Sequence, residues 1–254
     1  MVDTVNELDG KVVVVTGSVR KIGRATAEEL AKAGAVVVVN GRSSKELGEE
    51  VANGIVKSGG KAITIQADIS DPDAVTKMMN QTALEFGGID ILVNNASWRN
   101  IMPIEEMDLE TFKRAQSVQL DGAFKSWRAM ISYMIPRGEG NIIGIGGVGS
   151  TKGMPGRAHA EAVKNAMHAL IRSMALDLAK YQMHCNVCVV GNFDTTREGS
   201  SSVALSHLEN DPIPLCRHGH PQGLANLVRF AVGPNASHIT GQTLHCNGGL
   251  YMAL

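Results

Sequence analysis

Residues 11–23 read KVVVVTGSVRKIG, and this stretch decides the fold. Lys11–Thr16 is a β-branched, apolar run, as expected for a strand that is covered on both faces. A helical pattern follows, so the glycine-containing turn joins a strand to a helix. In such a turn Gly17 permits the tight bend, Gly23 permits close packing of helix on strand, and the helix N-terminus can bind a phosphate. The stretch therefore predicts an α/β domain that opens with a phosphate-binding turn.

Short β-branched runs alternate with longer helical patterns along the rest of the chain, and Leu170, Met174 and Leu178 mark one helical stripe. This alternation implies parallel strands joined by right-handed crossovers, hence a doubly wound sheet. Residues 1–254 contain no evident linker or repeat and are expected to form one domain. The long irregular stretch 191–221 is expected to be either a substrate lid or a disordered insertion. The six further strands are expected at Ala35–Asn40, Lys61–Gln66, Ile89–Val93, Asn141–Ile145, Cys185–Val190 and Gln242–Cys246.

The composition argues against several classes of protein. The 254 residues carry 24 Lys and Arg against 25 Asp and Glu, which argues against nucleic-acid binding through bulk positive charge. No apolar run approaches the ~20 residues of a membrane-spanning helix, and the polar N-terminus is unlike a signal peptide. Four cysteines make no disulfide framework. These features predict a cytoplasmic protein with reduced thiols that binds neither nucleic acid nor membrane.

Several motifs, taken in order, resemble those of the short-chain dehydrogenases/reductases along the whole chain. Residues 16–23, TGSVRKIG, resemble that family's TGxxxGxG, and residues 94–97, NNAS, resemble its NNAG. Asp68 stands where the family's aspartate contacts adenine. Residues 187–195 resemble the segment that touches the nicotinamide amide, and residues 214–249 resemble the family's C-terminal third. The resemblance implies a Rossmann-like sheet of seven parallel strands, a small-molecule substrate, and a homotetramer or dimer built on the two long helices that flank the fifth strand.

The resemblance also implies a nicotinamide dinucleotide cofactor, and two departures bear on it. Lys21 replaces the middle glycine, where its side chain could crowd the pyrophosphate or its charge attract it; binding is expected to be retained. The second strand ends in Asn40 in place of the carboxylate by which NAD users bind the ribose. Arg42 can donate two parallel hydrogen bonds to a 2′-phosphate and Arg20 can add charge, so NADP(H) is expected over NAD(H), unless Arg42 is a solvated loop residue. The implied cofactor-binding residues are Gly17, Ser18, Arg20, Lys21, Ile22, Gly23, Arg42, Ser43, Asp68, Ile69, Asn94, Ala96, Lys164, Gly191, Phe193 and Thr195.

The positions that carry the family's catalysis are altered. The family uses Tyr as general acid/base, Lys to lower the pKa of that Tyr and hold the ribose, Ser to orient the carbonyl, and Asn to anchor a water in the proton relay. The Lys is present as Lys164. The Tyr position, four residues earlier on the same helix face, is Ala160. The Ser position is Gly147, and the Asn position is Gln119. The resemblance therefore implies a divergent member that lacks the catalytic Ser and Tyr.

Other side chains are candidates to replace the missing proton donor. His159 lies beside the Tyr position and titrates near neutrality, but it could equally be a cap histidine that points away. Ser150 could reach the site if its loop adjusts, and Arg157 could bind a carboxylate or an enolate oxygen or be solvated. Trp98 could stack on a substrate or pack as core. No tyrosine is expected in the cleft from its spacing, although Tyr251 could reach one through tail packing or from a neighbouring subunit.

Three functions are open from the sequence. The first is an NADP(H)-binding oxidoreductase that transfers hydride to a small carbonyl, enone or iminium substrate, with Lys164, His159, Gln119 and Arg157 at its catalytic centre. The second is a non-redox lyase, isomerase, dehydratase or hydrolase on the same scaffold. The third is a nucleotide-binding pseudoenzyme with a protein partner. No metal site is expected, because the His and Cys spacing matches no zinc pattern and the C-x-x-C at 185–188 lies in a predicted strand.

Overall fold

The computed structural model describes residues 6–43, 45–194 and 213–252, and within them seven strands form one sheet. The strand order is β3-β2-β1-β4-β5-β6-β7, and each neighbouring pair is parallel. All seven predicted strands are confirmed, with ends that differ from the prediction by at most two residues. Their bounds are Val12–Val15 (β1), Val36–Gly41 (β2), Lys61–Gln66 (β3), Ile91–Asn94 (β4), Gly140–Gly147 (β5), Met183–Val190 (β6) and Thr243–Cys246 (β7).

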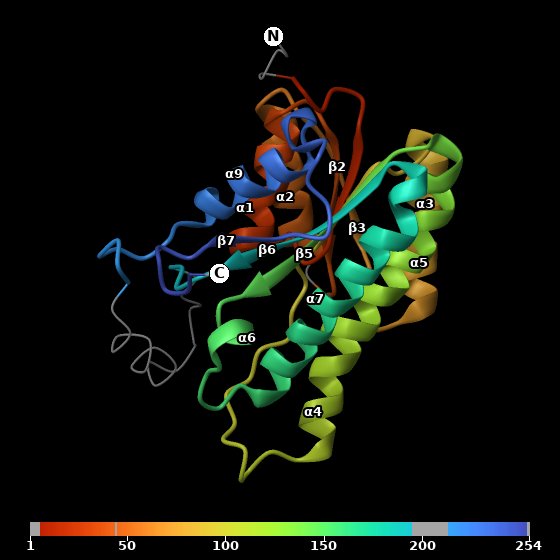
Figure 1. The fold of residues 1–254 in the computed structure, drawn as a ribbon. Helices are drawn as coiled ribbons and strands as arrows, with labels where there is room; N and C mark the ends of the chain where they lie inside the picture. Colours follow the sequence, from red (N-terminus) through yellow and green to blue (C-terminus); the bar gives the residue numbers. More distant parts are fainter. Residues whose placement is uncertain (1–5, 44, 195–212, 253–254) are drawn as a thin grey trace.

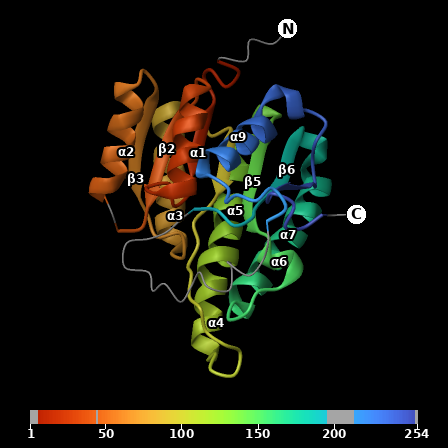
Figure 2. The same cartoon turned by 90° about the vertical axis from the view of Figure 1, so that its left-hand side faces the viewer.

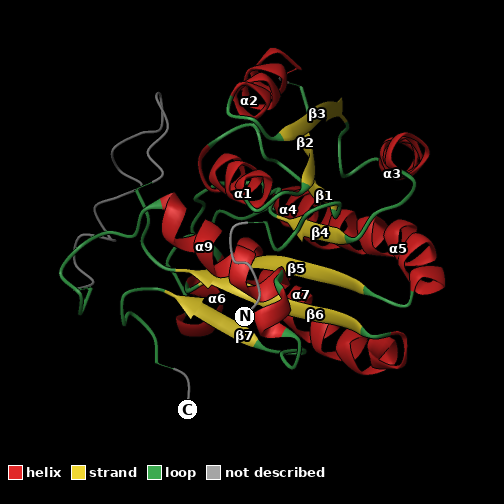
Figure 3. Ribbon diagram, turned by 90° about the horizontal axis from the view of Figure 1, so that it is seen from above, coloured by secondary structure: helices red, strands yellow, loops and turns green. Residues whose placement is uncertain are grey.

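Helices cover both faces of the sheet (Figure 3), and each face has its own cluster of buried apolar side chains. Val13 and Val15 of β1 enter one cluster and Val14 enters the other, which is why this strand is apolar at every position. The result is the predicted Rossmann-like, doubly wound fold. One face carries α1 (Lys21–Lys32), α2 (Lys45–Lys57) and α9 (Pro221–Val232), and the other carries α3 (Pro72–Phe86), α5 (Gly122–Met134) and α7 (Ala158–Leu178).

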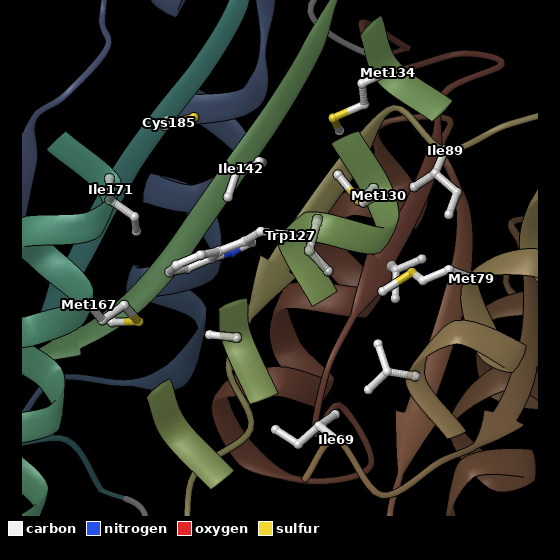
Figure 4. Close-up of a cluster of buried hydrophobic side chains, with 14 of the residues drawn as sticks. Ile69, Met79, Ile89, Trp127, Met130, Met134, Ile142, Met167, Ile171 and Cys185 are labelled. Carbon is white, nitrogen blue, oxygen red and sulfur yellow. The ribbon is translucent and has the colours of Figure 1, made fainter. Parts of the chain in front are cut away.

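The cluster beneath α5 and α7, part of which Figure 4 shows, contains most of the largest fully buried side chains. Trp127 of α5 is buried there together with Met167 and Ile171 of α7. The predicted α7 stripe is therefore only partly correct. Leu170 and Met174 are half-buried at the edge of this cluster, because the buried face of the helix runs through Met167 and Ile171, one position away around the axis.

The sheet grows in opposite directions from its centre, since β1 pairs with β2 on one side and with β4 on the other. In doubly wound sheets, ligands bind at the carboxyl ends of the strands near such a switch point. Figures 1 and 2 show α4 and α6 projecting at this end of the molecule. Among the described residues, no helix has the length and apolar character that crossing a bilayer requires. The remaining helical segments are α4 (Leu109–Gln116), a π-helical turn (Ser117–Asp121), α6 (Gly149–Lys152), and three short 3₁₀ turns at Ile135–Arg137, Ala179–Tyr181 and Pro234–Ala236.

A buried histidine in α7 couples the stability of the fold to pH. The Nε2 atom of His168 has no hydrogen-bond partner and lies against β5, where a Cβ added to Gly146 would be 2.6 Å from it. Burial, and then the positive charges of Arg172, Lys164 and His245, lower the pKa of His168 from 6.5 to about 4. Between these two pH values the unfolded chain therefore binds a proton that the folded chain does not.

We expect the free energy of unfolding to decrease by about 3 kcal/mol as the pH falls from about 6.5 to about 4, and His168→Leu to remove most of that decrease. Chemical denaturation across this pH range measures it. His218→Leu, which changes an exposed histidine, is the matched control and should keep the wild-type slope. An unchanged slope in His168→Leu would assign the pH dependence to other groups.

Candidate active site

Two glycines keep the turn after β1 free of side chains. Gly17 has a φ of +63°, in the left-handed region, and a Cβ there would lie 2.8 Å from the Cα of Ala96. A Cβ on Gly23 would overlap the carbonyl oxygen of Gly17 and lie 2.8 Å from the Cα of Ser18. Because neither position admits a side chain without displacement, the backbone of the turn stays open to a ligand at the N-terminus of α1.

Asn95, which follows β4, ties this turn to the neighbouring strand. Its side-chain amide donates to the carbonyl oxygens of Thr16 at 3.0 Å and Gly17 at 2.9 Å. The backbone amides of Asn95 and Ala96 donate to the Thr16 hydroxyl at 3.0 and 3.1 Å. These four bonds join the carboxyl ends of β1 and β4, so the shape of the turn is fixed by the protein itself.

Asn40 of β2 has a structural role in the turn. Its buried Oδ1 accepts from the amide of Gly17 at 3.2 Å. Its Nδ2 donates to the carbonyl oxygens of Ile65 at 3.2 Å and Ala67 at 3.1 Å. The Asn40 side chain thus braces the turn against the end of β3.

Ser18 and Ile22 also have side chains engaged within the protein. The Ser18 hydroxyl donates to the Val15 carbonyl at 2.7 Å and accepts from the Asn40 amide at 2.9 Å. Ile22 is buried in the cluster beneath α1. Both side chains support the turn from below, which leaves their backbone as the part that can face a ligand.

Four polar residues beside the turn are exposed, namely Arg20 and Lys21 at the start of α1 and Arg42 and Ser43 after β2. Lys21 has a φ of +50°, a conformation that favours glycine, but its exposed side chain does not fill the turn. Within the described ranges, none of the three cations here takes part in an ion pair. Their charge is therefore available to an anionic ligand.

Asp68 and Ile69 follow β3 at the same edge of the sheet. Burial raises the pKa of Asp68, but hydrogen bonds from the Ser70 hydroxyl and amide, at 2.7 and 2.9 Å, and the charges of Arg42 and Arg114 outweigh it, so the pKa is lowered. The Asp68 carboxylate is thus ionised at neutral pH. The side chain of Ile69 is buried.

A narrow cavity between β4, β5 and α7 brings five of the predicted residues together. Both side-chain amide atoms of Asn94 and the Nε2 of Gln119 are buried there without hydrogen-bond partners. Gln119 lies in the π-helical turn, a feature frequent at functional sites, and its Oε1 accepts from the Ser97 hydroxyl at 3.2 Å. Buried polar atoms without partners are costly, so they mark a place for a polar ligand or water. The lining residues are Ile69, Asn94, Ala96, Ser97, Val118, Gln119, Ala123, Ile145, Lys164 and Met167.

Lys164 reaches the cavity from α7. Burial is the main cause that lowers its pKa from 10.5 to about 8; Glu161 opposes the shift, and Arg99 and Arg157 add to it. A Cβ built on Gly147 would lie 2.7 Å from the Nζ of Lys164. At the position of the family's serine the amine therefore meets only backbone.

The hydroxyl groups near Lys164 do not replace the family's pair. Ala160, one turn before Lys164, is buried and carries no hydroxyl. The Ser150 hydroxyl donates to the Gly147 carbonyl at 2.7 Å, so it is used within the turn of α6. The hydroxyl that does line the cavity belongs to Ser97.

The three tyrosines lie elsewhere. The Tyr133 hydroxyl donates to Asn80 and so links α5 to α3. Tyr181 lies in the 3₁₀ turn after α7. The Tyr251 ring packs on His245 at a centroid distance of 5.2 Å. The cavity-lining residues of the described chain accordingly include no tyrosine.

His159 lies at the start of α7, packed beneath the residues that follow β4. Its ring is buried, both ring nitrogens lack hydrogen-bond partners, and its centroid is 5.8 Å from that of Trp98. Burial and then the charge of Arg157 lower the pKa of His159 against an opposing contribution from the Asn100 carbonyl, so the imidazole is neutral at neutral pH. Neither predicted alternative describes it fully, because His159 is not a solvated cap and does not line the cavity with Lys164.

Gly191 and Phe193 follow β6 and are held by the C-terminal part of the chain. A Cβ on Gly191 would lie 2.6 Å from the Cα of Asn247, and the Phe193 ring packs directly on Gly219. Thr195 lies outside the described residues, as does the 195–212 part of the predicted lid.

Two residues of the site escaped sequence reasoning. The Glu161 carboxylate is buried beside α6, where a Cβ on Gly149 would lie 2.5 Å from its Oε1, and its Oε2 has no hydrogen-bond partner. The contact between Glu161 and Gly149 depends on how α7 packs on α6, so no pattern along the sequence reveals it. Ser97 binds Gln119 and ends the NNAS motif, and its place in that motif was a signal that could have identified it.

The fold and the site define an α/β protein with a dinucleotide-type turn at its switch point and a lysine in the helix after β5. Comparison with known proteins agrees. Residues 17–251 match a family model described as enoyl-(acyl carrier protein) reductase. The 3-oxoacyl-(acyl-carrier-protein) reductases of Synechocystis sp. and Vibrio cholerae are 34% and 32% identical over 250 and 245 residues, covering 96% of this chain and 98% and 99% of theirs.

Solved structures give the same result. The crystal structure of a short chain dehydrogenase from Burkholderia cenocepacia in complex with NADP is 31% identical and has a TM-score of 0.90, covering 96% of this chain and 99% of that one. The chain belongs to the short-chain dehydrogenase/reductase family of oxidoreductases.

Proposed function

We propose that the protein is an NADP(H)-dependent oxidoreductase that exchanges hydride with a small carbonyl, enone or iminium compound without the family's Ser and Tyr. One observation carries the proposal: Lys164 lines a cavity with Gln119 and Asn94, whereas positions 147 and 160 present only a glycine and an alanine. The name of the Synechocystis relative, a 3-oxoacyl-(acyl-carrier-protein) reductase, and the description of the matching family model as an enoyl reductase support the first two substrate classes.

The residues present fit the cofactor. Gly17 and Gly23 leave the turn free of side chains, and Asn94 keeps two buried amide atoms for a ligand. When bound, the nicotinamide ring supplies or accepts the hydride. Arg42 and Arg20, both exposed, would hold a 2′-phosphate, and the NADP complex of the Burkholderia neighbour supports this choice of nucleotide. The other residues that would hold the cofactor are Ser18, Lys21, Ile22, Ser43, Asp68, Ile69, Ala96, Lys164, Gly191, Phe193 and Thr195.

For a carbonyl substrate, Lys164 would hold on its Nζ the proton that the substrate oxygen receives; an iminium substrate needs none. A pKa of about 8 leaves the amine protonated at neutral pH and able to release the proton, as a general acid must. The unpartnered Nε2 of Gln119 and the Ser97 hydroxyl would order a water beside it in the same cavity. We assign no proton transfer to His159, which is neutral and packed against Trp98.

Nucleotide titration and a substrate panel test the proposal. NADPH is expected to bind more tightly than NADH, and a carbonyl, enone or iminium compound is expected to oxidise it, measured as loss of NADPH absorbance. Turnover of a compound in the absence of nucleotide would instead identify a non-redox enzyme. Tight NADPH binding without turnover of any class would identify a nucleotide-binding protein.

Arg42→Ala is expected to weaken NADPH binding by about 10- to 100-fold, because charge-assisted hydrogen bonds contribute about 1.5–3 kcal/mol. NADH, which lacks the 2′-phosphate, should bind wild type and variant alike. Arg128→Ala removes the same charge from an exposed position on α5 and serves as the control. An equal loss for both nucleotides would contradict a role for Arg42 in choosing between them.

A further inference from the structure

Arg157, the residue before α7, has an unfilled hydrogen-bonding position. Its Nε is buried without a partner, and its Nη1 contacts only the sulfur of Met154 at 3.5 Å, a weak acceptor. In the described part of the chain no ion pair involves Arg157. A guanidinium nitrogen that is buried without an acceptor costs free energy, which an anionic ligand would recover.

The nearest carboxylate along the helix does not fill this position. Glu161 lies four residues beyond Arg157, but its Oε1 is turned towards Gly149 and its Oε2 has no hydrogen-bond partner. Among the described residues, no carboxylate therefore forms an ion pair with Arg157.

His159, two residues beyond Arg157, does not add a second donor for the same ligand. Its ring is fully buried and does not line the cavity with Lys164. Arg157 is therefore the group at the start of α7 that can bind an anion.

The positive charge extends to the reacting end of the site. Arg157 and Arg99 both act on the Lys164 amine. Arg114 lies over the Trp98 ring at 5.7 Å, and Trp98 in turn contacts His159. Glu161 acts on the same amine with the opposite sign, so the position of Arg157 carries more weight than the sum of the charges. Arg157 precedes Lys164 by seven residues, about two turns of helix, so the two side chains lie on the same face of α7.

We propose that the substrate is a short oxo acid, whose carboxylate is bound by Arg157 at the start of α7 while its carbonyl faces Lys164. This inference rests on the proposed function and adds the substrate class. A guanidinium suits a carboxylate because its planar N–H groups match the two oxygens.

Binding to the protein loaded with NADP+ tests the inference by calorimetry, in a buffer without phosphate or carboxylate. The probes are acetoacetate and pyruvate, each compared with its methyl ester, which keeps the ketone and removes the charge. At least one acid is expected to bind about 10- to 100-fold more tightly than its ester. Acids that bind no more tightly than their esters, or no binding by either acid, would overturn the inference.

Variants locate the site. Arg157→Gln is expected to reduce the affinity for the acid to that for the ester, Arg157→Lys to retain part of it, and Arg128→Gln to change nothing. Unchanged binding of the acid by Arg157→Gln would overturn the assignment. NADPH titration separates the two proposals. If the wild type neither binds the nucleotide nor transfers hydride, the proposed function fails. If it binds the nucleotide but does not discriminate the acid from the ester, only the oxo acid inference fails. The acid–ester comparison in the wild type needs no variant to fold.

Discussion

Lys164→Met is expected to lower the rate of NADPH-dependent reduction about 10³-fold while the protein stays folded, because a positioned general acid contributes about 10²- to 10⁴-fold. Methionine keeps an unbranched stem of similar length in the cavity that Lys164 lines together with Met167 and Ile145. Rates follow from NADPH absorbance, nucleotide affinity from NADPH fluorescence, and folding from a thermal melt. A variant that retains more than about a tenth of the wild-type rate would exclude Lys164 as the proton source.

Lys164→Arg separates proton donation from charge. Arginine keeps the positive charge but does not release a proton in the accessible pH range. Rescue of the rate by arginine would therefore show that Lys164 acts by charge alone, whereas loss of rate with retained NADPH affinity supports proton transfer.

The wild-type rate should also depend on pH in a defined direction. A donor is active only while protonated, and the pKa of Lys164 is about 8. Reduction is thus expected to be constant below pH about 8 and to fall about tenfold per pH unit above it. A rate that rises through this range would contradict an ammonium donor.

The fold could be predicted from the sequence because each strand carries its signal locally. Four consecutive valines, as in β1, are typical of a strand buried on both faces, and the structure places Val14 in one cluster and Val13 and Val15 in the other. The α7 stripe was misplaced by one position because half-buried and buried faces of a long helix both carry apolar residues. Periodicity gives the presence of such a helix more reliably than its rotation about the axis.

Residues of the candidate site could be predicted where a sequence motif fixes both the residue type and its position. Lys164, Gln119 and Asn94 came from motif positions, and the cavity brings them together. The sequence could not assign the contacts of Asn40 and His159, because these depend on neighbours that are distant in the chain. For Asn40 they are the turn at Gly17 and the carbonyls at the end of β3, and for His159 the ring of Trp98.

Gly23→Ala is expected to lower NADPH affinity about 100-fold, because the backbone amides of the turn would lose charge-assisted bonds to the pyrophosphate that contribute about 1.5–3 kcal/mol each. The new methyl would overlap the Gly17 carbonyl oxygen and approach Asn95 Nδ2 to 2.5 Å, the atom that holds that carbonyl in place. The turn must move, and overpacking of this kind also costs about 1–3 kcal/mol of stability.

Two other substitutions distinguish a distorted phosphate-binding turn from a general loss of stability. Gly54→Ala adds the same methyl within α2, where nothing lies within 4 Å, and should leave NADPH binding unchanged. Lys21→Gly places glycine at a φ of +50° and so relieves left-handed strain in the backbone. The variant should keep NADPH affinity within about threefold. The reason is that the Lys21 side chain is exposed, so its charge contributes to nucleotide binding only through a screened surface interaction. Wild-type affinity in Gly23→Ala would mean that the nucleotide does not lie on this turn. A loss of affinity in Lys21→Gly as large as in Gly23→Ala would instead show that the lysine holds the pyrophosphate directly, and that the glycine-to-lysine change in the motif replaced backbone recognition by a side-chain cation.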